Sequence, residues 1–567
     1  MRLLFCGIIF LFSATVLGQT DLRGNRTPDY DELVSSYQKL AAEHAEIELY
    51  NMGPSDYGLP IYLCVINGSQ DSVKTFEKAK AQTTVLINNA IHPGEPDGVN
   101  ASLLWIEEWI EAGKSVKDLP VIAIIPAYNI GGMMKRSGTS RANQNGPEEY
   151  GFRGNAQNLD LNRDCIKMDS KNMFTFARIY HALDPDLFMD THVTNGADYQ
   201  YTMTYIASPR KKMPDDLGNL TYQGLIPYLE ERSEKQGFPL IPYVNLKGSI
   251  PEEGIELFND LPRYIMGYTA LFHTISFTLE THMLKPFQDR VRATQLFIDE
   301  AIKWTGKHTN EIESARKSAF EWELQQEYLP INYSLCEQVD SIRFLGFEHA
   351  YQESEVTEQE RLKYDQQQPY DKYVPFYCEY RILDSVRVPD YYVVGGQCSD
   401  VIERLRANAV EMKVVDSFTS TSMEGIRILT FDSPGKPYEG HFLHSSVEVS
   451  YDSVGGQLKP GDVIIPTRQY KRRFLVQVLE PKAADSYFNW NFFDSYVQQK
   501  EYFSPYVFEE KAEELLSDEK IKADFEEKRR SDADFSESRW EQLYYLYQRS
   551  PYFEPSLNLL PVFRIQR

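Results

Sequence analysis

Between residues 59 and 282 the sequence alternates short apolar runs with helical segments, and this alternation limits the possible fold more than any other feature. The apolar runs are 59–66, 83–91, 120–129, 186–192 and 271–282. Most of them lack the polar–apolar alternation of a half-exposed strand, as is typical of strands buried on both faces. Helical candidates lie between and after them, at 97–113, 170–183, 221–236 and 286–304. This order predicts an α/β domain with a mixed, mostly parallel sheet sandwiched by helices.

The chain of 567 residues is too long for one compact core, so two or three domains are expected. We expect the α/β domain over 19–310, a polar helical linker region over 311–370, and a β-rich accessory domain with C-terminal helices over 371–567. The formal net charge of −24 argues against nucleic acid as a partner, because nucleic-acid binding needs a basic face.

The N-terminus has the pattern of a secretory signal peptide over residues 1–18. Arg2 supplies the positive start, residues 3–13 are apolar, and small residues lead to Gly18. The alternative is a membrane anchor, but the apolar stretch is short for a membrane span. We therefore expect a secreted or periplasmic protein that does not stay inserted in a membrane after cleavage.

Five cysteines remain after the signal peptide, and none of them forms a CxxC pair. A cysteine-ligated zinc site is therefore not expected. Cys378 and Cys398 could form a disulfide in an oxidising compartment, which the sequence alone cannot establish.

Chemically active residues collect where the apolar runs end. The run 83–91 is followed by "HPGE", with His92 and Glu95. The run 186–192 closes with Asp190-Thr-His192, and the run 271–282 closes with Glu280-Thr-His282. Ligands of α/β sheets gather at the carboxyl ends of the strands. Two histidines and one carboxylate form the ligand set of a catalytic zinc site that keeps one position open. Each of these residues alone could be an ordinary buried side chain, so the hypothesis depends on their combination.

The ordered motifs resemble the M14 family of zinc carboxypeptidases, including its large secreted bacterial members. They are "HPGE" (92–95), Asn162-Arg163 within "LDLNRD", "DTH" (190–192) and "LETH" (279–282), and they cover roughly residues 55–305. The resemblance implies a mixed eight-stranded α/β/α sandwich. It also implies one Zn²⁺ per chain, held by His92, Glu95 and His192.

The same resemblance implies roles for further residues. Glu280 would be the catalytic carboxylate, and Asn162 and Arg163 would bind the C-terminal carboxylate of the substrate. A second arginine near the scissile carbonyl fits Arg153 best, with Arg136 and Arg141 as rivals. The tyrosine that the family places before its catalytic glutamate could be Tyr264 or Tyr268.

Chemistry supports these assignments independently. Zinc lowers the pKa of its bound water to about 7, and a nearby carboxylate can take the proton. A planar guanidinium such as that of Arg163 matches a carboxylate with two parallel donors, although an ion pair with Asp160 or Asp164 is the alternative. Asp190 could orient a ligating histidine. We expect His282 to be structural.

The predicted function is removal of C-terminal residues from peptides that carry a free C-terminal carboxylate. One alternative is a related zinc amidohydrolase that acts on cell-wall peptides or N-acyl amino acids. Another is a non-catalytic protein that binds peptides or glycans. The β-rich C-terminal region contains no chemical motif that would separate these hypotheses.

Overall fold

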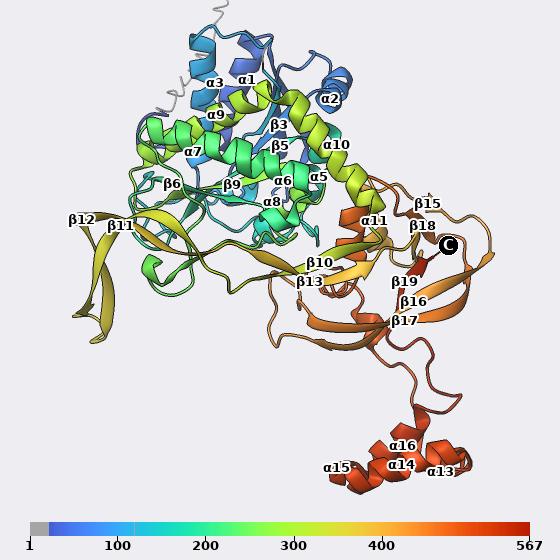
Figure 1. Ribbon diagram of the computed structural model, residues 1–567. Coiled ribbons are helices and arrows are strands. Elements are labelled where there is room, and N and C mark those ends of the chain that lie inside the picture. The colour runs from blue at the N-terminus through green and yellow to red at the C-terminus, as the bar shows by residue number, and fades with distance from the viewer. Residues whose placement is uncertain (1–21, 118, 567) are drawn as a thin grey trace, which may run out of the picture. The chain divides into compact units, whose positions relative to one another are not determined.

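Figure 1 shows the computed structural model, which describes residues 22–117 and 119–566. The chain divides into two compact units, and it passes between them more than once. The first unit comprises the chain up to Asp260, Tyr264–Trp322 and Leu335–Arg381, and the second comprises Leu261–Arg263, Glu323–Ser334 and the chain from Ile382. The predicted signal peptide lies outside the described residues. Among the helices of 22–117 and 119–566, none has both the length and the apolar character that a membrane crossing needs.

The first unit is built on a mixed seven-stranded sheet in the order β1-β2-β4-β3-β5-β9-β6. Its strands are β1 (Ile47–Pro54), β2 (Pro60–Ile66), β3 (Thr84–Asn88), β4 (Val121–Ile125), β5 (Leu187–Thr194), β6 (Met203–Ala207) and β9 (Ile275–His282). β4, β3, β5 and β9 run parallel to one another, whereas β1, β2 and β6 pair antiparallel with their neighbours. β3, β4 and β5 are buried along their whole length, as their unbroken apolar sequences predict.

The predicted number of eight strands is wrong for the described residues, which form seven strands in this sheet. Beyond β6 the sheet continues only as a single parallel bridge between Tyr205 and Pro242. Proline has no N–H to donate, so a segment with Pro239 and Pro242 is poorly suited to a regular ladder. The sheet is mixed and mostly parallel, as predicted, because β1 runs in the same direction as β4, β3, β5 and β9 and only β2 and β6 run the opposite way.

Helices flank this sheet (Figure 1). They are α1 (Tyr30–Glu43), α2 (Ser72–Ala81), α3 (Asp97–Glu111), α4 (Ile130–Met133), α5 (Lys171–Leu183), α6 (Asp215–Asn219), α7 (Ile226–Lys235), α8 (Ile265–Ala270), α9 (Phe287–Lys307) and α10 (Thr309–Gln325). α3 packs against α9, and α5 packs against α2 and β1. The predicted helices at 97–113, 170–183 and 286–304 agree with α3, α5 and α9 to within a few residues.

The segment 311–370 is helical only as far as Gln325. It continues as β10 (Tyr328–Leu335), β11 (Asp340–Glu353) and β12 (Glu360–Tyr377), and β11 and β12 form a long antiparallel hairpin that joins the short strands β7 (Asn245–Leu246) and β8 (Ile255–Glu256). Most hairpin residues are exposed, which explains the polar sequence that suggested a helical linker. Only the base of the hairpin packs on an apolar cluster, through Phe344, Tyr370 and Val374.

The second unit is β-rich with terminal helices, as predicted. Its six-stranded sheet has the order β15-β18-β14-β19-β16-β17. The strands of this sheet are β14 (Tyr391–Val394), β15 (Lys413–Val414), β16 (Thr419–Asp432), β17 (Ser445–Leu458), β18 (Val463–Pro466) and β19 (Leu559–Ile565). A separate two-stranded sheet pairs β10 with β13 (Tyr380–Arg387). Its helices are α11 (Ser399–Ala407), α12 (Arg472–Leu479), α13 (Pro505–Leu515), α14 (Glu519–Ser531), α15 (Ala533–Glu537) and α16 (Arg539–Tyr547). Cys378 belongs to the first unit and Cys398 to the second, and both are free thiols in the structure.

Candidate metal centre

Three potential metal ligands meet at the carboxyl edge of the central strands. His92 and Glu95 lie in the loop between β3 and α3, and His192 lies near the end of β5. Because β3 and β5 are parallel neighbours, their ends lie at the same edge of the sheet. The sequence folds this way locally because the buried strand β3 is followed by a Pro-Gly turn that ends just before α3.

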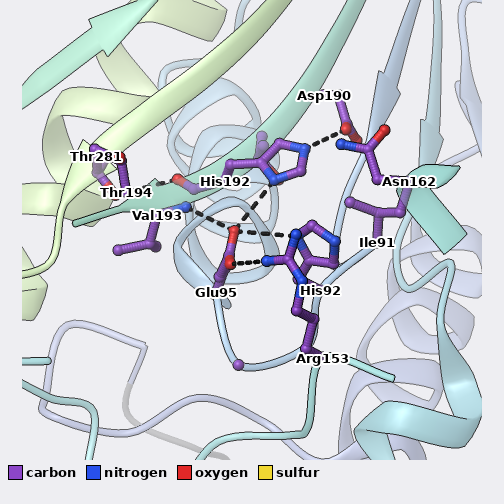
Figure 2. A network of polar contacts seen from close by, with 12 residues as sticks. Ile91, His92, Glu95, Arg153, Asn162, Asp190, His192, Val193, Thr194 and Thr281 are labelled. Carbon is purple, nitrogen blue, oxygen red and sulfur yellow. Dashed lines mark hydrogen bonds and ion pairs between the residues drawn. The ribbon is translucent and has the colours of Figure 1, made fainter. Parts of the chain in front are cut away.

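The three side chains converge closely (Figure 2). Nδ1 of His92 and Nδ1 of His192 lie 3.4 Å and 3.1 Å from the same oxygen, Oε2 of Glu95. One ligand atom from each residue can be chosen so that all three lie within 4.8 Å of one another. The side chains of His92, Glu95 and His192 are 2%, 3% and 4% exposed. Such a compact, buried cluster has the dimensions of a site for a single cation.

The outer nitrogens of both histidines are held by carboxylates. Nε2 of His92 lies 2.8 Å from Oδ1 of Asp160, and Nε2 of His192 lies 2.5 Å from Oδ2 of Asp190. A carboxylate that accepts from one ring nitrogen leaves the other nitrogen with its lone pair, as in carboxylate–histidine–zinc triads. Nδ1 of His92 is buried and has no hydrogen-bond partner. These residues therefore fit a Zn²⁺ ion bound by two imidazoles and one carboxylate.

Charge and burial shift the pKa values of Glu95 and His192 strongly. Burial alone would raise the pKa of Glu95, but His92, His192 and Arg141 outweigh it, so the pKa lies well below its usual value. Burial alone would lower the pKa of His192, but Asp190, Glu95 and Glu280 outweigh it, so the pKa lies well above its usual value. The acidic and basic groups of this cluster thus stabilise one another's charged forms.

Glu280 stands next to the ligands on the adjacent strand. It is the register partner of His192 in the parallel pair β5–β9. Burial raises the pKa of Glu280 to about 7, where the charge of Glu95 adds to the effect and His192 opposes it. A carboxylate with a pKa near neutrality is suited to exchanging protons during a reaction.

A cavity of about 380 Å³ opens over these residues. The predicted site residues that line it are His92, Glu95, Arg153, Asn162, Arg163, His192, Tyr264 and Glu280. Asp190 does not line the cavity, because it lies behind His192 and holds that ring.

The pair Asn162-Arg163 lies in the 3₁₀ turn η1 (Leu161–Arg163), which Asp160 caps by accepting from the backbone N–H of Asn162 at 2.8 Å. Oδ1 of Asn162 accepts from the N–H of Ile265 at 2.9 Å, which fixes the orientation of the amide. The guanidinium of Arg163 lies over the ring of Tyr264, with 4.5 Å between Cζ and the ring centroid. An amide and a guanidinium thus face one cavity from one turn.

Two of the three candidate second arginines line the cavity. Nη1 of Arg153 lies 3.2 Å and Nη1 of Arg141 lies 2.8 Å from Oε1 of Glu95. Arg153 also pairs with Oδ2 of Asp160 at 2.9 Å. Arg136 does not line the cavity; it donates to the backbone oxygen of Thr27 and pairs with Glu149.

Tyr268 is not brought to the cavity, so its proposed contact with substrate finds no support. Its ring is buried against Phe272, and its hydroxyl lies 3.1 Å from Nε2 of His181. Tyr264 precedes α8 in an extended conformation, whereas Tyr268 lies inside the helix, so the two side chains do not share a face. His282 is structural as expected: its Nε2 lies 2.8 Å from the backbone oxygen of Ala197.

The contact between Asp160 and His92, and the cavity positions of Tyr243, Phe258 and Met266, are not apparent from the sequence. Asp160 stands in the motif "LDLNRD", two residues before Asn162, and its carboxylate was the available signal. Tyr243 and Phe258 lie in irregular segments with no motif, so only the fold brings them to the site.

Sequence comparison finds no relative: no family model and no curated protein matches this chain. Solved structures of carboxypeptidases are similar to about half of it. A metallo-carboxypeptidase from Burkholderia cenocepacia is 16% identical, with 47% of this chain and 67% of that chain covered and a TM-score of 0.34. One from Pseudomonas aeruginosa, in complex with (2-guanidinoethylmercapto)succinic acid, is 14% identical, with 49% and 68% covered and a TM-score of 0.34.

Bovine thrombin-activatable fibrinolysis inhibitor, in complex with tick carboxypeptidase inhibitor, is 12% identical, with 52% of this chain and all of that chain covered and a TM-score of 0.38. At identities and TM-scores this low, the assignment of a function depends on the residues of the site. Fold and site define an α/β protein with a two-histidine, one-carboxylate centre at the edge of its sheet.

Proposed function

We propose that this protein is a zinc-dependent carboxypeptidase, which removes C-terminal residues from peptides outside the cytoplasm. One observation carries the proposal: Asn162 and Arg163 line the same cavity as His92, Glu95, His192 and Glu280. A group that can recognise a carboxylate therefore lies in one compartment with a metal-ligand set and a carboxylate of raised pKa.

His92, Glu95 and His192 would hold the ion. When bound there, Zn²⁺ supplies a water of lowered pKa and polarises the scissile carbonyl. Glu280, beside His192, takes a proton from the attacking water and delivers it to the leaving amine, a role worth about 10²–10⁴-fold in rate. Asp160 and Asp190 keep the histidine rings in the tautomer that leaves Nδ1 available.

Arg163 and Asn162 bind the C-terminal carboxylate of the peptide. A guanidinium offers two parallel donors that match a carboxylate, and the amide of Asn162 adds a further donor. Arg163 is 22% exposed, and its Nη1 lies 3.8 Å from Oδ2 of Asp160, so a substrate carboxylate would compete with this long ion pair. Arg153 lies between Asp160 and Glu95 at the cavity wall and would stabilise charge on the carbonyl oxygen.

The experiment compares peptides with a free C-terminal carboxylate with the same peptides as C-terminal amides. Wild-type protein with zinc should release the last residue from the free acids only. Equal cleavage of the amides would contradict the exopeptidase assignment and favour a hydrolase of other amides, such as cell-wall peptides or N-acyl amino acids.

Two controls test the catalytic assignment. Removal of the metal by a chelator should abolish turnover, and added Zn²⁺ should restore it. Glu280→Gln should bind zinc like the wild type but lose about 10²–10⁴-fold in kcat. If Glu280→Gln turns over at the wild-type rate, Glu280 is not the general base.

A further inference from the structure

Arg141 makes an unusually complete set of contacts for a residue on a connecting loop. Nη1 lies 2.8 Å from Oε1 of Glu95, Nη2 donates to the backbone oxygen of Val193 at 2.8 Å, and Nε donates to Oε1 of Gln144 at 2.5 Å. All three guanidinium nitrogens are therefore engaged. The side chain is only 15% exposed.

These contacts bridge the two segments that carry the metal ligands. Glu95 lies in the loop after β3, and Val193 is the residue next to His192 on β5. One rigid, planar group therefore spans both segments and limits how far they can move apart. Arg153 pairs with Glu95 and Asp160 and is 46% exposed, so it provides a looser contact with Glu95 than Arg141 does.

The chain near Arg141 is also packed onto the loop that contains His92 and Glu95. Gln144 donates through Nε2 to the backbone oxygen of Gly94 at 3.0 Å. A Cβ atom at Gly94 would lie 3.0 Å from Cδ of Arg141 and 3.1 Å from the backbone oxygen of Gly151. A side chain at Gly94 would thus crowd the arginine stem, so the glycine of "HPGE" favours the close approach of Arg141.

The two oxygens of the Glu95 carboxylate make different contacts. Oε1 is held by Arg141 and Arg153, whereas Oε2 accepts from the N–H of Val193 at 3.0 Å and faces both histidine Nδ1 atoms. A carboxylate fixed at both oxygens cannot rotate. Oε2 is therefore the oxygen presented to an ion.

We propose that Arg141 is a positioning residue of the metal centre, which orients Glu95 and joins the two ligand-bearing segments. This inference rests on the proposed function, because it assigns a role toward the zinc ion. A guanidinium also repels a nearby cation, which opposes its orienting effect. We expect the orienting effect to outweigh this repulsion for two reasons. Arg141 binds Oε1 of Glu95, which points away from the histidines, and Arg153 keeps a positive charge beside Glu95 in any Arg141 variant.

The test measures zinc affinity of the full-length protein by competition with a chelating dye, together with the visible spectrum of the Co²⁺-substituted protein. Arg141→Met should bind zinc about 10-fold more weakly and change the Co²⁺ spectrum, in line with the usual cost of losing a partner of a metal ligand. Arg141→Lys restores one bond and should recover part of the affinity. Arg136→Met, on the same loop but away from the cavity, is the matched control and should bind zinc like the wild type.

Zinc affinity in Arg141→Met that equals or exceeds that of the wild type would overturn the inference. If Arg141→Met does not fold, Arg141→Gln gives the same comparison with a side chain that keeps a donor. The proposed function can fail while this inference holds. That would be the outcome if the wild type binds zinc at a site that depends on Arg141 but releases no C-terminal residue from peptides. A wild type that binds no zinc would reject both.

Discussion

At the scale of single residues, the same desolvation acts in opposite directions on two neighbours in β9. Burial raises the pKa of the Glu280 carboxyl to about 7 and lowers the pKa of the His282 imidazole to about 4. In each case the charged form is disfavoured by removal from water. Glu280 faces the cavity, where this shift serves proton transfer, whereas His282 is fully buried and bonded to Ala197, where the shift affects only stability.

His282 should make the fold sensitive to acid. Its pKa in the folded protein is lowered from 6.5 to about 4, so His282 is mostly neutral in both states at pH 7 and then costs little stability. As the pH falls from 6.5 toward 4, His282 binds a proton in the unfolded chain but stays neutral in the folded chain. Stability therefore falls by about 1.4 kcal/mol per pH unit, to a total of about 3 kcal/mol.

The measurement is urea unfolding of the metal-free protein at pH 7 and pH 4.5, for the wild type and His282→Gln. The glutamine keeps a donor for the Ala197 oxygen but cannot titrate. The loss of stability between the two pH values should be about 2–3 kcal/mol smaller in the variant. An equal loss in both proteins would show that His282 does not contribute to acid sensitivity.

Arg163 should determine the affinity for free-acid peptides. Charge-assisted hydrogen bonds to a carboxylate are worth about 1.5–3 kcal/mol, so Arg163→Met should raise KM by about 10- to 100-fold. The effect on kcat should be smaller, because the arginine binds the substrate and not the reacting carbonyl. Steady-state kinetics on one peptide, with its amide as the control, measures this; an unchanged KM would exclude Arg163 from substrate binding.

The sequence could predict residues that combine a reactive side chain with a strand end. His92, Glu95, His192 and Glu280 follow or end buried apolar runs, and the structure brings all four together. Asp160 and Arg141 were harder to assign, because they lie in a loop whose path depends on tertiary packing. Tyr268 was misplaced because the sequence did not show where α8 begins. Tyr264 precedes the helix and lines the cavity, whereas Tyr268 lies inside the helix and is buried.

At the scale of secondary-structure elements, the metal-ligand loop and the Glu280 strand are tied together by Arg290 on α9. Its guanidinium makes a two-point pair with Asp97, at 2.9 Å and 3.1 Å, and Asp97 is also the acceptor of the Thr281 hydroxyl. Asp97 lies two residues after Glu95, and Thr281 follows Glu280. Arg290 also donates to four backbone carbonyls, those of Asn145, Gly146, Met283 and Lys285.

Arg290→Met should therefore destabilise the first unit severely. The substitution would leave Asp97, which is 1% exposed, without its cationic partner, and breaking a buried ion pair from one side costs about 3–5 kcal/mol. The double variant Arg290→Met/Asp97→Asn, which removes the orphaned charge, should recover part of this loss. Chemical unfolding measures both variants, and a loss below about 1 kcal/mol in Arg290→Met would contradict a structural role for the pair.

The elements of 59–304 were predictable because their strands and helices are buried on one or more faces and therefore carry an apolar pattern. The hairpin β11–β12 was not predictable. Most of its residues face water, so its sequence lacks the alternation of polar and apolar residues that indicates a strand. The missing eighth strand has a similar cause. Its position next to β6 is occupied by a proline-containing segment, and the pairing of such a segment is decided by tertiary contacts.

At the scale of the whole molecule, the course of the chain explains why a single boundary near residue 310 does not describe the structure. Residues 261–263 and 323–334 belong to the second unit, while 335–381 return to the first. Sequence composition reports where the chain becomes polar, but it does not report which core a short segment joins. The net charge of −24 likewise describes the molecule and not its site, because Arg141, Arg153 and Arg163 line the cavity together.

This cavity should select peptides whose last side chain is apolar. Among its described lining residues, the apolar ones are Ala142, Val193, Ile206, Phe258, Met266 and Met283. The only carboxylates among them are Glu95 and Glu280, which the proposed function assigns to the metal centre and to proton transfer. A lysine or arginine side chain would enter a site that holds three guanidinium groups and no spare anion. Burying an unpaired charge costs several kcal/mol, so we expect kcat/KM to be at least about 100-fold higher for a terminal Phe or Leu than for a terminal Lys.

The measurement uses one peptide series that differs only in its last residue, with zinc present and ionic strength held constant. Met266→Asp supplies the missing carboxylate at the cavity wall and should narrow the difference between Leu and Lys, mainly by improving cleavage of the lysine peptide. Asn145→Asp, which adds the same charge at a position that does not line the cavity, is the matched control and should leave the ratio unchanged. A wild type that prefers terminal lysine would mean that the three arginines do not face the substrate side chain, and the substrate would then have to lie differently from the orientation that Arg163 implies.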